Sequence, residues 1–226
     1  MREDGSARRN YLKTLLLTAG GMGLMGAMRQ LLAAGESPVL PGVARLEGVL
    51  RVNGKSLRPG DAVSLPATLE SGADSRAVFV VGRSAFLVRD NVRVELSGEG
   101  DVVRSMRVLT GRILSVFEHG AREVRTPAAV IGIRGTGMYL DVMPEQTYFC
   151  LCYGEADLMA VDYPVWHEHL QTHHHDSPRM IYASGEQMIV RERVKGHDDD
   201  ELIMLEALVG RVPPFHSAWG GGPSAY

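Results

Sequence analysis

The chain contains two cysteines, Cys150 and Cys152, and a single leucine separates them in the segment TYFCLCYG, residues 147–154. Residues i and i+2 of a β-strand point to the same side, so the two thiols would project together while Leu151 points into apolar packing on the other face. Two thiolates on one face suit a soft metal ion. Their Cα atoms would lie about 6.5–7 Å apart, at the upper limit of what a disulfide spans.

Five of the eight histidines follow within residues 167–175, and two of them repeat the i, i+2 spacing. Imidazoles and thiolates together suit Zn²⁺ or copper, with iron as a further candidate. The sequence therefore predicts a Cys/His metal site. The predicted ligands are Cys150, Cys152, His173 and His174, the further candidates are His167, His169 and His175, and Asp176 is the residue expected to orient an imidazole.

Three alternatives to a metal site remain open at this stage. The cysteines could form a distorted disulfide in an oxidising compartment, they could be buried thiols that act as small apolar groups, or the histidines could belong to an exposed loop without a ligand role. We expect His119 in a turn, His197 at a helix start and His216 in the terminal tail. No catalytic residues are predicted, and the pattern leans away from an enzyme.

The N-terminal segment has the pattern of an export signal. The stretch ARRNYLK contains the arginine pair Arg8 and Arg9 ahead of an uncharged, Gly-rich run from Thr14 to Met28. This resembles a twin-arginine signal, and the run is shorter than the roughly twenty apolar residues of a membrane span. We therefore expect residues 1–35 to direct export to the periplasm. Cleavage near Ala34 and retention as an uncleaved anchor are both open.

The charge distribution bears on the class of partner. The formal net charge is -3, with +3 over residues 1–35 and -6 over the remainder. A mildly acidic body offers no basic stripe for phosphates, which argues against nucleic-acid binding. Contact with a membrane is expected only through the N-terminal segment, if it is uncleaved.

From Val39 to about Val142 the pattern is that of short strands between Gly, Pro, Asn and Asp turns, at spacings of eight to ten residues. Asn53-Gly54 is a hairpin signal because both positions tolerate positive φ. Near the C-terminus, GHDDDELIMLEALVGRVPPF predicts a helix with an aspartate cap, an apolar stripe and an end at Gly210. The predicted fold is all-β, a β-sandwich or β-solenoid, with one C-terminal α-helix.

Several blocks resemble the FecR domain, the periplasmic module named for the ferric-citrate signalling regulator. The strongest is RTPAAVIGIRGT, Arg125 to Thr136, which matches the family signature Thr-Pro-x-Ala-x-x-x-x-Arg-Gly-Thr; the resemblance extends from Val39 to Leu158. It implies an all-β fold in which Arg134, Gly135 and Thr136 have a structural role. Thirteen residues precede the apolar run, so we do not expect the regulator's cytoplasmic anti-sigma segment or its control of a sigma factor.

Together these features predict five regions: a signal at 1–35, a FecR-like domain at 36–195, a His-rich crossover loop at 161–178 within it, a helical segment at 196–212 and a flexible tail at 213–226. The expected function is that of a periplasmic binding or sensing module with a Cys/His metal site and an envelope protein as partner. A metal-free interaction domain and a redox or metal-dependent enzyme are the alternatives.

Overall fold

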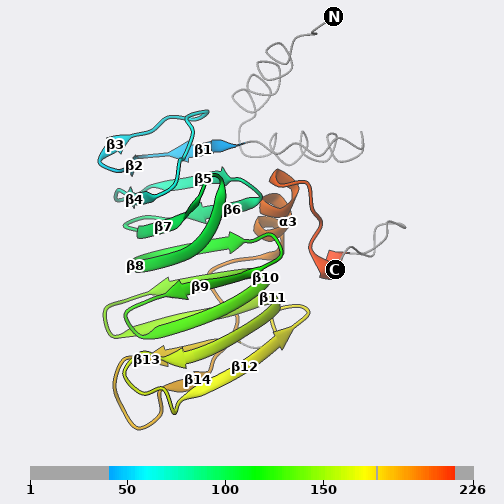
Figure 1. The fold of residues 1–226 in the computed structure, drawn as a ribbon. Helices are drawn as coiled ribbons and strands as arrows, with labels where there is room; N and C mark the ends of the chain where they lie inside the picture. The colour runs from blue at the N-terminus through cyan, green and yellow to red at the C-terminus, as the bar shows by residue number, and fades with distance from the viewer. Residues whose placement is uncertain (1–40, 177, 217–226) are drawn as a thin grey trace, which may run out of the picture.

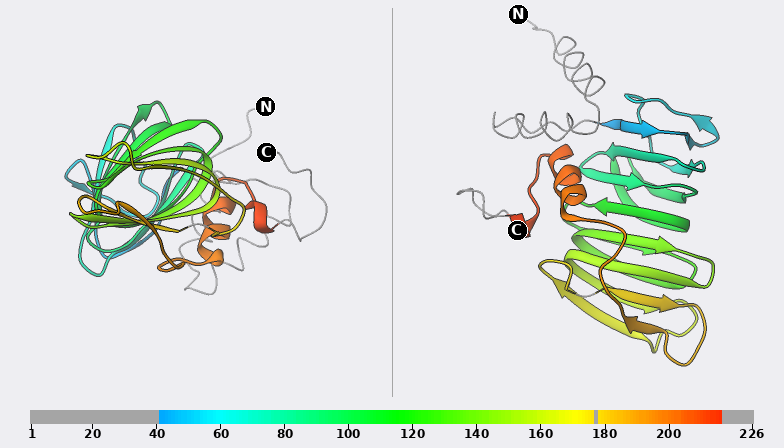
Figure 2. Two further views of the ribbon diagram at one scale, coloured as in Figure 1. Left: turned by 90° about the horizontal axis from the view of Figure 1, so that it is seen from below. Right: turned by 180° about the vertical axis from the view of Figure 1, so that it is seen from behind.

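A computed structural model describes residues 41–176 and 178–216, and within them the chain forms fourteen strands and one α-helix (Figure 1). The strands belong to one hydrogen-bonded network that folds over itself into two layers (Figure 2). The predicted all-β fold with a C-terminal helix is confirmed. The segment predicted to be a twin-arginine signal, residues 1–35, lies outside the described residues. No described helix has the length and hydropathy needed to cross a membrane.

We call the two layers layer 1 and layer 2, and three long strands contribute to both. Layer 1 contains, in spatial order, β3 (Lys55–Ser56), β2 (Leu50–Val52), β4 (Ala67–Ser71), β7 (Arg93–Glu99), the first part of β8 (Val102–Val116), β9 (Ala121–Arg125), the first part of β10 (Ala129–Val142), the second part of β11 (Gln146–Ala160) and β12 (His167–Thr172). Layer 2 contains β1 (Gly42–Glu47), β5 (Arg76–Val81), β6 (Ser84–Val88), the remaining parts of β8, β10 and β11, then β13 (Arg179–Tyr182) and β14 (Ile189–Arg191).

The long strands pass from one layer to the other at glycines. In β10 the register shifts between Arg134 and Gly137, at the sequence Arg134-Gly135-Thr136. Opposite it, Gly154 of β11 has φ of +98°, and a Cβ there would lie 2.7 Å from the side chain of Thr136, which is fully buried. The close approach of β10 and β11, where both strands bend, therefore requires glycine at position 154. Arg134 is exposed and forms no salt bridge with a described carboxylate, so the backbone builds this corner.

Two hydrophobic clusters are buried on opposite sides of layer 2. The inter-layer core lies between the layers and includes Phe79, Phe86 and Leu151. The outer cluster lies on the other face of layer 2, where residues such as Leu87 and Leu114 pack with the helix α3 (Asp199–Leu208). Figure 2 shows this helix against the side of the strand stack.

Local signals at both ends of the described chain act as the sequence predicts. Asn53 and Gly54 have φ of +51° and +79° between β2 and β3, as the hairpin requires. Asp198 is the N-cap of α3, where its side chain accepts from the backbone N–H of Glu201, and Gly210 follows the helix with φ of +71°. Pro214–His216 form a 3₁₀ turn, η1, at the start of the segment predicted as a tail.

The prediction of a loop through the His-rich crossover is wrong for its central part. Residues His167–Thr172 form β12, which pairs with β11. Its exposed residues, such as His167 and His169, alternate with the partly or fully buried Glu168, Leu170 and Thr172. An edge strand with one face in water tolerates polar residues at every second position. The segment therefore has the polar composition of a loop although it is a strand.

Candidate metal centre

The first part of β11 presents both cysteines on the outer face of layer 2. Cys150 and Cys152 belong to the outer cluster and have no exposed surface, whereas Leu151 points into the inter-layer core. The two thiols therefore share a side, as the i, i+2 spacing predicts. They are not joined in a disulfide in the structure.

His175 reaches the cysteines from the loop after β12. Its backbone N–H donates to the carbonyl of Cys152 at 2.9 Å, and its φ of +51° turns the chain at that point. The ring then lies with Nδ1 at 3.5 Å from Sγ of Cys150 and Nε2 at 3.0 Å from Oδ1 of Asp199. One histidine thus joins the strand to the first residue of α3.

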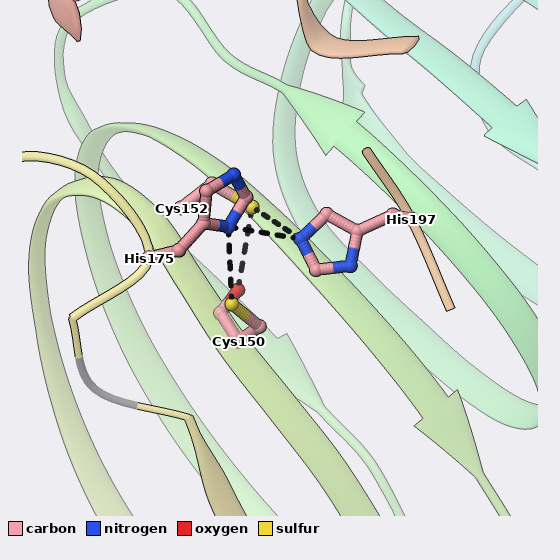
Figure 3. Close-up of side chains that lie close together, drawn as sticks. All are labelled: Cys150, Cys152, His175 and His197. Atoms are coloured by element: carbon pink, nitrogen blue, oxygen red, sulfur yellow. Dashed lines mark hydrogen bonds between the residues drawn. The ribbon is translucent and has the colours of Figure 1, made fainter. Parts of the chain in front are cut away.

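His197 approaches from the opposite side, on the segment that enters α3 (Figure 3). The phenol of Tyr148 holds this segment, because it donates to the carbonyl of Arg193 and accepts from the N–H of Lys195. The His197 ring stacks on Tyr139 at a centroid distance of 4.6 Å, with an interplanar angle of 17°. This places Nε2 of His197 at 3.3 Å from Sγ of Cys152 and at 3.1 Å from Nδ1 of His175.

Four donor atoms, two sulfurs and two nitrogens, therefore lie within 4.8 Å of one another. In a tetrahedral site with usual zinc distances, N–N edges are about 3.3 Å, N–S edges about 3.6 Å and S–S edges about 3.8 Å. The N–N separation of 3.1 Å and the two N–S separations of 3.3 and 3.5 Å are close to those edges. The cluster could hold a metal ion with four protein ligands.

The outer hydrogen bonds of both imidazoles turn their lone pairs toward this cluster. Nδ1 of His197 lies 3.0 Å from the carbonyl oxygen of Lys195, which can only accept, so Nδ1 carries the hydrogen and Nε2 presents a lone pair. A neutral His175 likewise donates from Nε2 to Asp199 and presents Nδ1. A carbonyl and a carboxylate are the usual outer partners of metal-bound histidines.

The electrostatics of the cluster favour negative charge on Cys150 beside positive charge on His175. A hydrogen bond with the Cys152 thiol lowers the pKa of Cys150; burial opposes this shift, and the contacts with His175 and His197 add to it. Burial raises the pKa of Cys152. Burial works against charge on His175, but its contacts with Cys150 and Asp199 outweigh this and raise its pKa. A metal cation bound here would displace the protons of the thiols.

The structure separates the predicted ligands into two groups. Cys150 and Cys152 lie in the cluster, together with His175, which the sequence places among the further candidates. His174 lies beside it, with Nε2 at 2.9 Å from Oδ1 of Asp199. The remaining predicted residues, His167, His169, His173 and Asp176, lie outside: His169 contacts Asp157, and Asp176 accepts from the backbone N–H of His173 at 3.4 Å.

His197 and Asp199 are not among the ligands predicted from the sequence. His197 is expected there at a helix start, and Asp199 belongs to the acidic run at the beginning of the same predicted helix. Both expectations place the residue correctly in the chain, but they do not include the packing of the helix on layer 2. The available signal was the apolar stripe of α3, because a helix that must bury one face on the sheet brings the residues at its N-terminus to that sheet as well.

The sequence matches no protein-family model and no curated protein. Among solved structures, the fold is coarsely similar to two crystal structures, at 2.50 and 1.65 Å resolution, of a "putative anti-sigma factor" from Parabacteroides distasonis. The TM-scores are 0.45 and 0.46, the sequence identity is 10% in both, and each alignment covers 56% of this chain and 59% of the other. The chain thus spans less than two thirds of those proteins, and a likeness at this level carries no argument about function.

Proposed function

We propose that this protein is an exported, FecR-like binding module of the cell envelope whose Cys₂His₂ centre holds Zn²⁺. The observation that supports it best is the convergence of Cys150, Cys152, His175 and His197 with both imidazole lone pairs facing inward. Cu(I) is the second candidate ion, since thiolate and imidazole ligands suit both.

The ligand set also bears on the kind of role. Four protein ligands close a tetrahedral site, whereas a catalytic zinc keeps one position for water or substrate. Both sulfurs are fully buried, so reagents in solution do not reach them directly. These features favour a metal that holds parts of the protein together, and through them a binding or sensing role, over metal-dependent catalysis.

The metal that would occupy this centre joins three segments of the chain. Cys150 and Cys152 belong to β11, His175 follows β12, and His197 precedes α3. Bonds from one ion to all three would tie the C-terminal segment to layer 2. The proposed module therefore presents its C-terminal segment in one fixed arrangement to an envelope protein when the metal is bound.

Elemental analysis of the full chain purified under reducing conditions tests the metal. We expect about one zinc per chain in the native protein and less than about 0.1 in a Cys150→Ser/Cys152→Ser variant. His173→Ala is the matched control, because His173 is exposed and outside the cluster, and it should keep full occupancy. Native protein that binds no metal under zinc supplementation would leave a metal-free interaction domain as the function, and a thiol count on a second sample, purified without reductant, would reveal a disulfide.

Export is tested separately by cell fractionation. The arginine pair and the FecR resemblance support a periplasmic location. We expect the native chain in the periplasmic fraction, and an Arg8→Lys/Arg9→Lys variant in the cytoplasm. An equal distribution of the two proteins would contradict the twin-arginine route without affecting the metal proposal.

A further inference from the structure

A buried centre needs a route by which the ion arrives and leaves. The two sulfurs have no exposed surface, and the ring of His197 is covered on one side by Tyr139. On the side of His175, in contrast, the structure opens toward solvent through two partly exposed groups. The side chains of His174 and Asp199 are 44% and 46% exposed, and that of His175 is 11% exposed.

These three residues form a second set of ligand atoms next to the first. Nε2 of His174 lies 2.9 and 3.1 Å from the two oxygens of Asp199, and Nε2 of His175 lies 3.0 Å from Oδ1. Two imidazoles and a carboxylate, with room for water, are a ligand set that divalent first-row ions bind. Without a thiolate the set binds such ions more weakly than the buried centre does.

His175 belongs to both sets, because its two ring nitrogens face in opposite directions. Nδ1 faces the sulfurs and Nε2 faces Asp199. His174 has no such double role: Asp199 already accepts from His175, so the buried centre does not need His174 for its orientation. The buried centre alone therefore does not explain why His174, an exposed potential ligand, also contacts the carboxylate of Asp199.

We propose that His174, His175 and Asp199 form an exposed exchange site through which a divalent transition-metal ion enters and leaves the buried Cys₂His₂ centre. This inference rests on the proposed metal-binding function. An ion that arrives from solvent first binds His174 and Asp199 in exchange for water. It then moves past His175 to the sulfurs, and the thiol protons pass to solvent. The ring proton that His174 gives up to water while it holds the ion is regained when the ion leaves it.

Once the ion is inside, Asp199 returns to its hydrogen bonds with both histidines. No electron is transferred in any step, and the only bonds that change are those of the metal and of the released protons. Because a ligand that helps the ion in also helps it out, His174 should affect the rates of binding and release together and change the equilibrium affinity little.

Stopped-flow kinetics with Zn²⁺ alone test this. Apo protein is prepared with a chelator under reducing conditions, binding is followed from proton release, and release is followed with a chromophoric chelator in excess. We expect His174→Ala to slow both rate constants by at least about fivefold while the dissociation constant changes by less than about twofold. His174→Gln separates the roles, since glutamine still donates a hydrogen bond to Asp199 but is a poor ligand for zinc, and it should be as slow as His174→Ala.

His173→Ala is the matched control and should keep native rates, because His173 is exposed, precedes His174 in the chain and belongs to neither set of ligand atoms. Native rates in His174→Ala would overturn the exchange site. Native rates in His174→Gln alone would overturn it too, because they would show that His174 acts only as a hydrogen-bond partner of Asp199. A native protein that takes up no Zn²⁺ at all would instead contradict the proposed function. The two failures are therefore distinct.

Discussion

Two buried regions on opposite faces of layer 2 differ in what they demand of their side chains. In the inter-layer core the ring of Phe86 stacks on Phe79 at 5.0 Å and meets Phe117 edge-on at 5.5 Å. In the outer cluster, β11 carries Tyr148, Tyr153 and the two cysteines, and the polar atom of each has a partner on the C-terminal segment or the loop after β12.

The difference shows where chemistry is placed in this fold. An apolar core tolerates many side chains of suitable volume, so the inter-layer core specifies the two layers and little else. The outer cluster needs particular atoms at particular distances, and those atoms come from segments far apart in sequence. The following predictions test this contrast, from the largest expected effect to the smallest.

Truncation of Phe86 should cause the largest loss of stability. Phe86→Ala removes a ring that packs against two others in the inter-layer core, and we expect the free energy of unfolding, measured by urea denaturation, to fall by about 3–5 kcal/mol. Phe86→Leu keeps most of the volume and should lose about 1.5 kcal/mol or less. Zinc content per folded chain should be native in both. A parallel loss of zinc from folded protein would contradict the separation of the two regions.

Removal of the metal should act on the outer cluster alone. With free Zn²⁺ at about a hundred times its dissociation constant, addition of a chelator should lower the free energy of unfolding by about 2.7 kcal/mol. Hydrogen exchange should accelerate at residues 173–176 and 193–199, while β5 and β6 stay protected. The Cys150→Ser/Cys152→Ser variant should not respond to the chelator. Uniform acceleration over all strands would show that the metal supports both regions equally.

A smaller effect is expected from the carboxylate that orients His175. Asp199→Asn replaces an anionic acceptor with a neutral amide, and the affinity for Zn²⁺, measured by competition with a chelator, should fall by about 10–100-fold. Asp200→Asn is the matched control: it lies in the same helical turn, outside the cluster, and should stay within about twofold of native affinity. Equal losses in the two variants would assign the effect to helix charge instead of to the contact with His175.

The smallest effect concerns an ion pair at the open end of the inter-layer core. Arg179 of β13, with a side chain 4% exposed, binds Glu168 of β12, whose side chain is 35% exposed. The hydrogen bond from Arg179 lowers the pKa of Glu168 below its usual 4.5, against the effect of burial. The pair therefore contributes stability that is fully present above pH 4.5 and is lost as the pH falls through the lowered pKa.

We expect this contribution to be about 1 kcal/mol or less, because Glu168 is partly solvated. The measurement is urea denaturation at about pH 7 and about pH 3 in the native protein and in Glu168→Gln. The variant should lose less stability on acidification than the native chain. Glu123→Gln, at the exposed pair with Arg125, should follow the native chain. An unchanged pH dependence in Glu168→Gln would show that the pair contributes nothing.

Features encoded by neighbouring residues could be predicted from the sequence. The Asn53-Gly54 turn, the shared face of Cys150 and Cys152, and the capped helix that begins after Asp198 all follow from local periodicity and backbone preference. The strand at His167–Thr172 could not, because one exposed polar face masks its alternation.

The complete ligand set could not be predicted either, for a different reason. His197 lies 3.3 Å from Cys152, although 45 residues separate them. Their contact depends on how α3 packs on layer 2, on the support of Tyr148 and on a glycine at position 196, where a Cβ would lie 2.4 Å from the phenol oxygen of Tyr139. These are tertiary relations that no local pattern contains.

The order of the ligands along the chain has a consequence for biosynthesis. Cys150 and Cys152 are made first, His175 follows, and His197 is the last of the four to be made. A nascent or truncated chain that ends before His197 has three of the four ligands and lacks α3, which covers the outer face of layer 2. Occupancy of the centre would thus report that synthesis has passed residue 197 and that α3 has docked on layer 2.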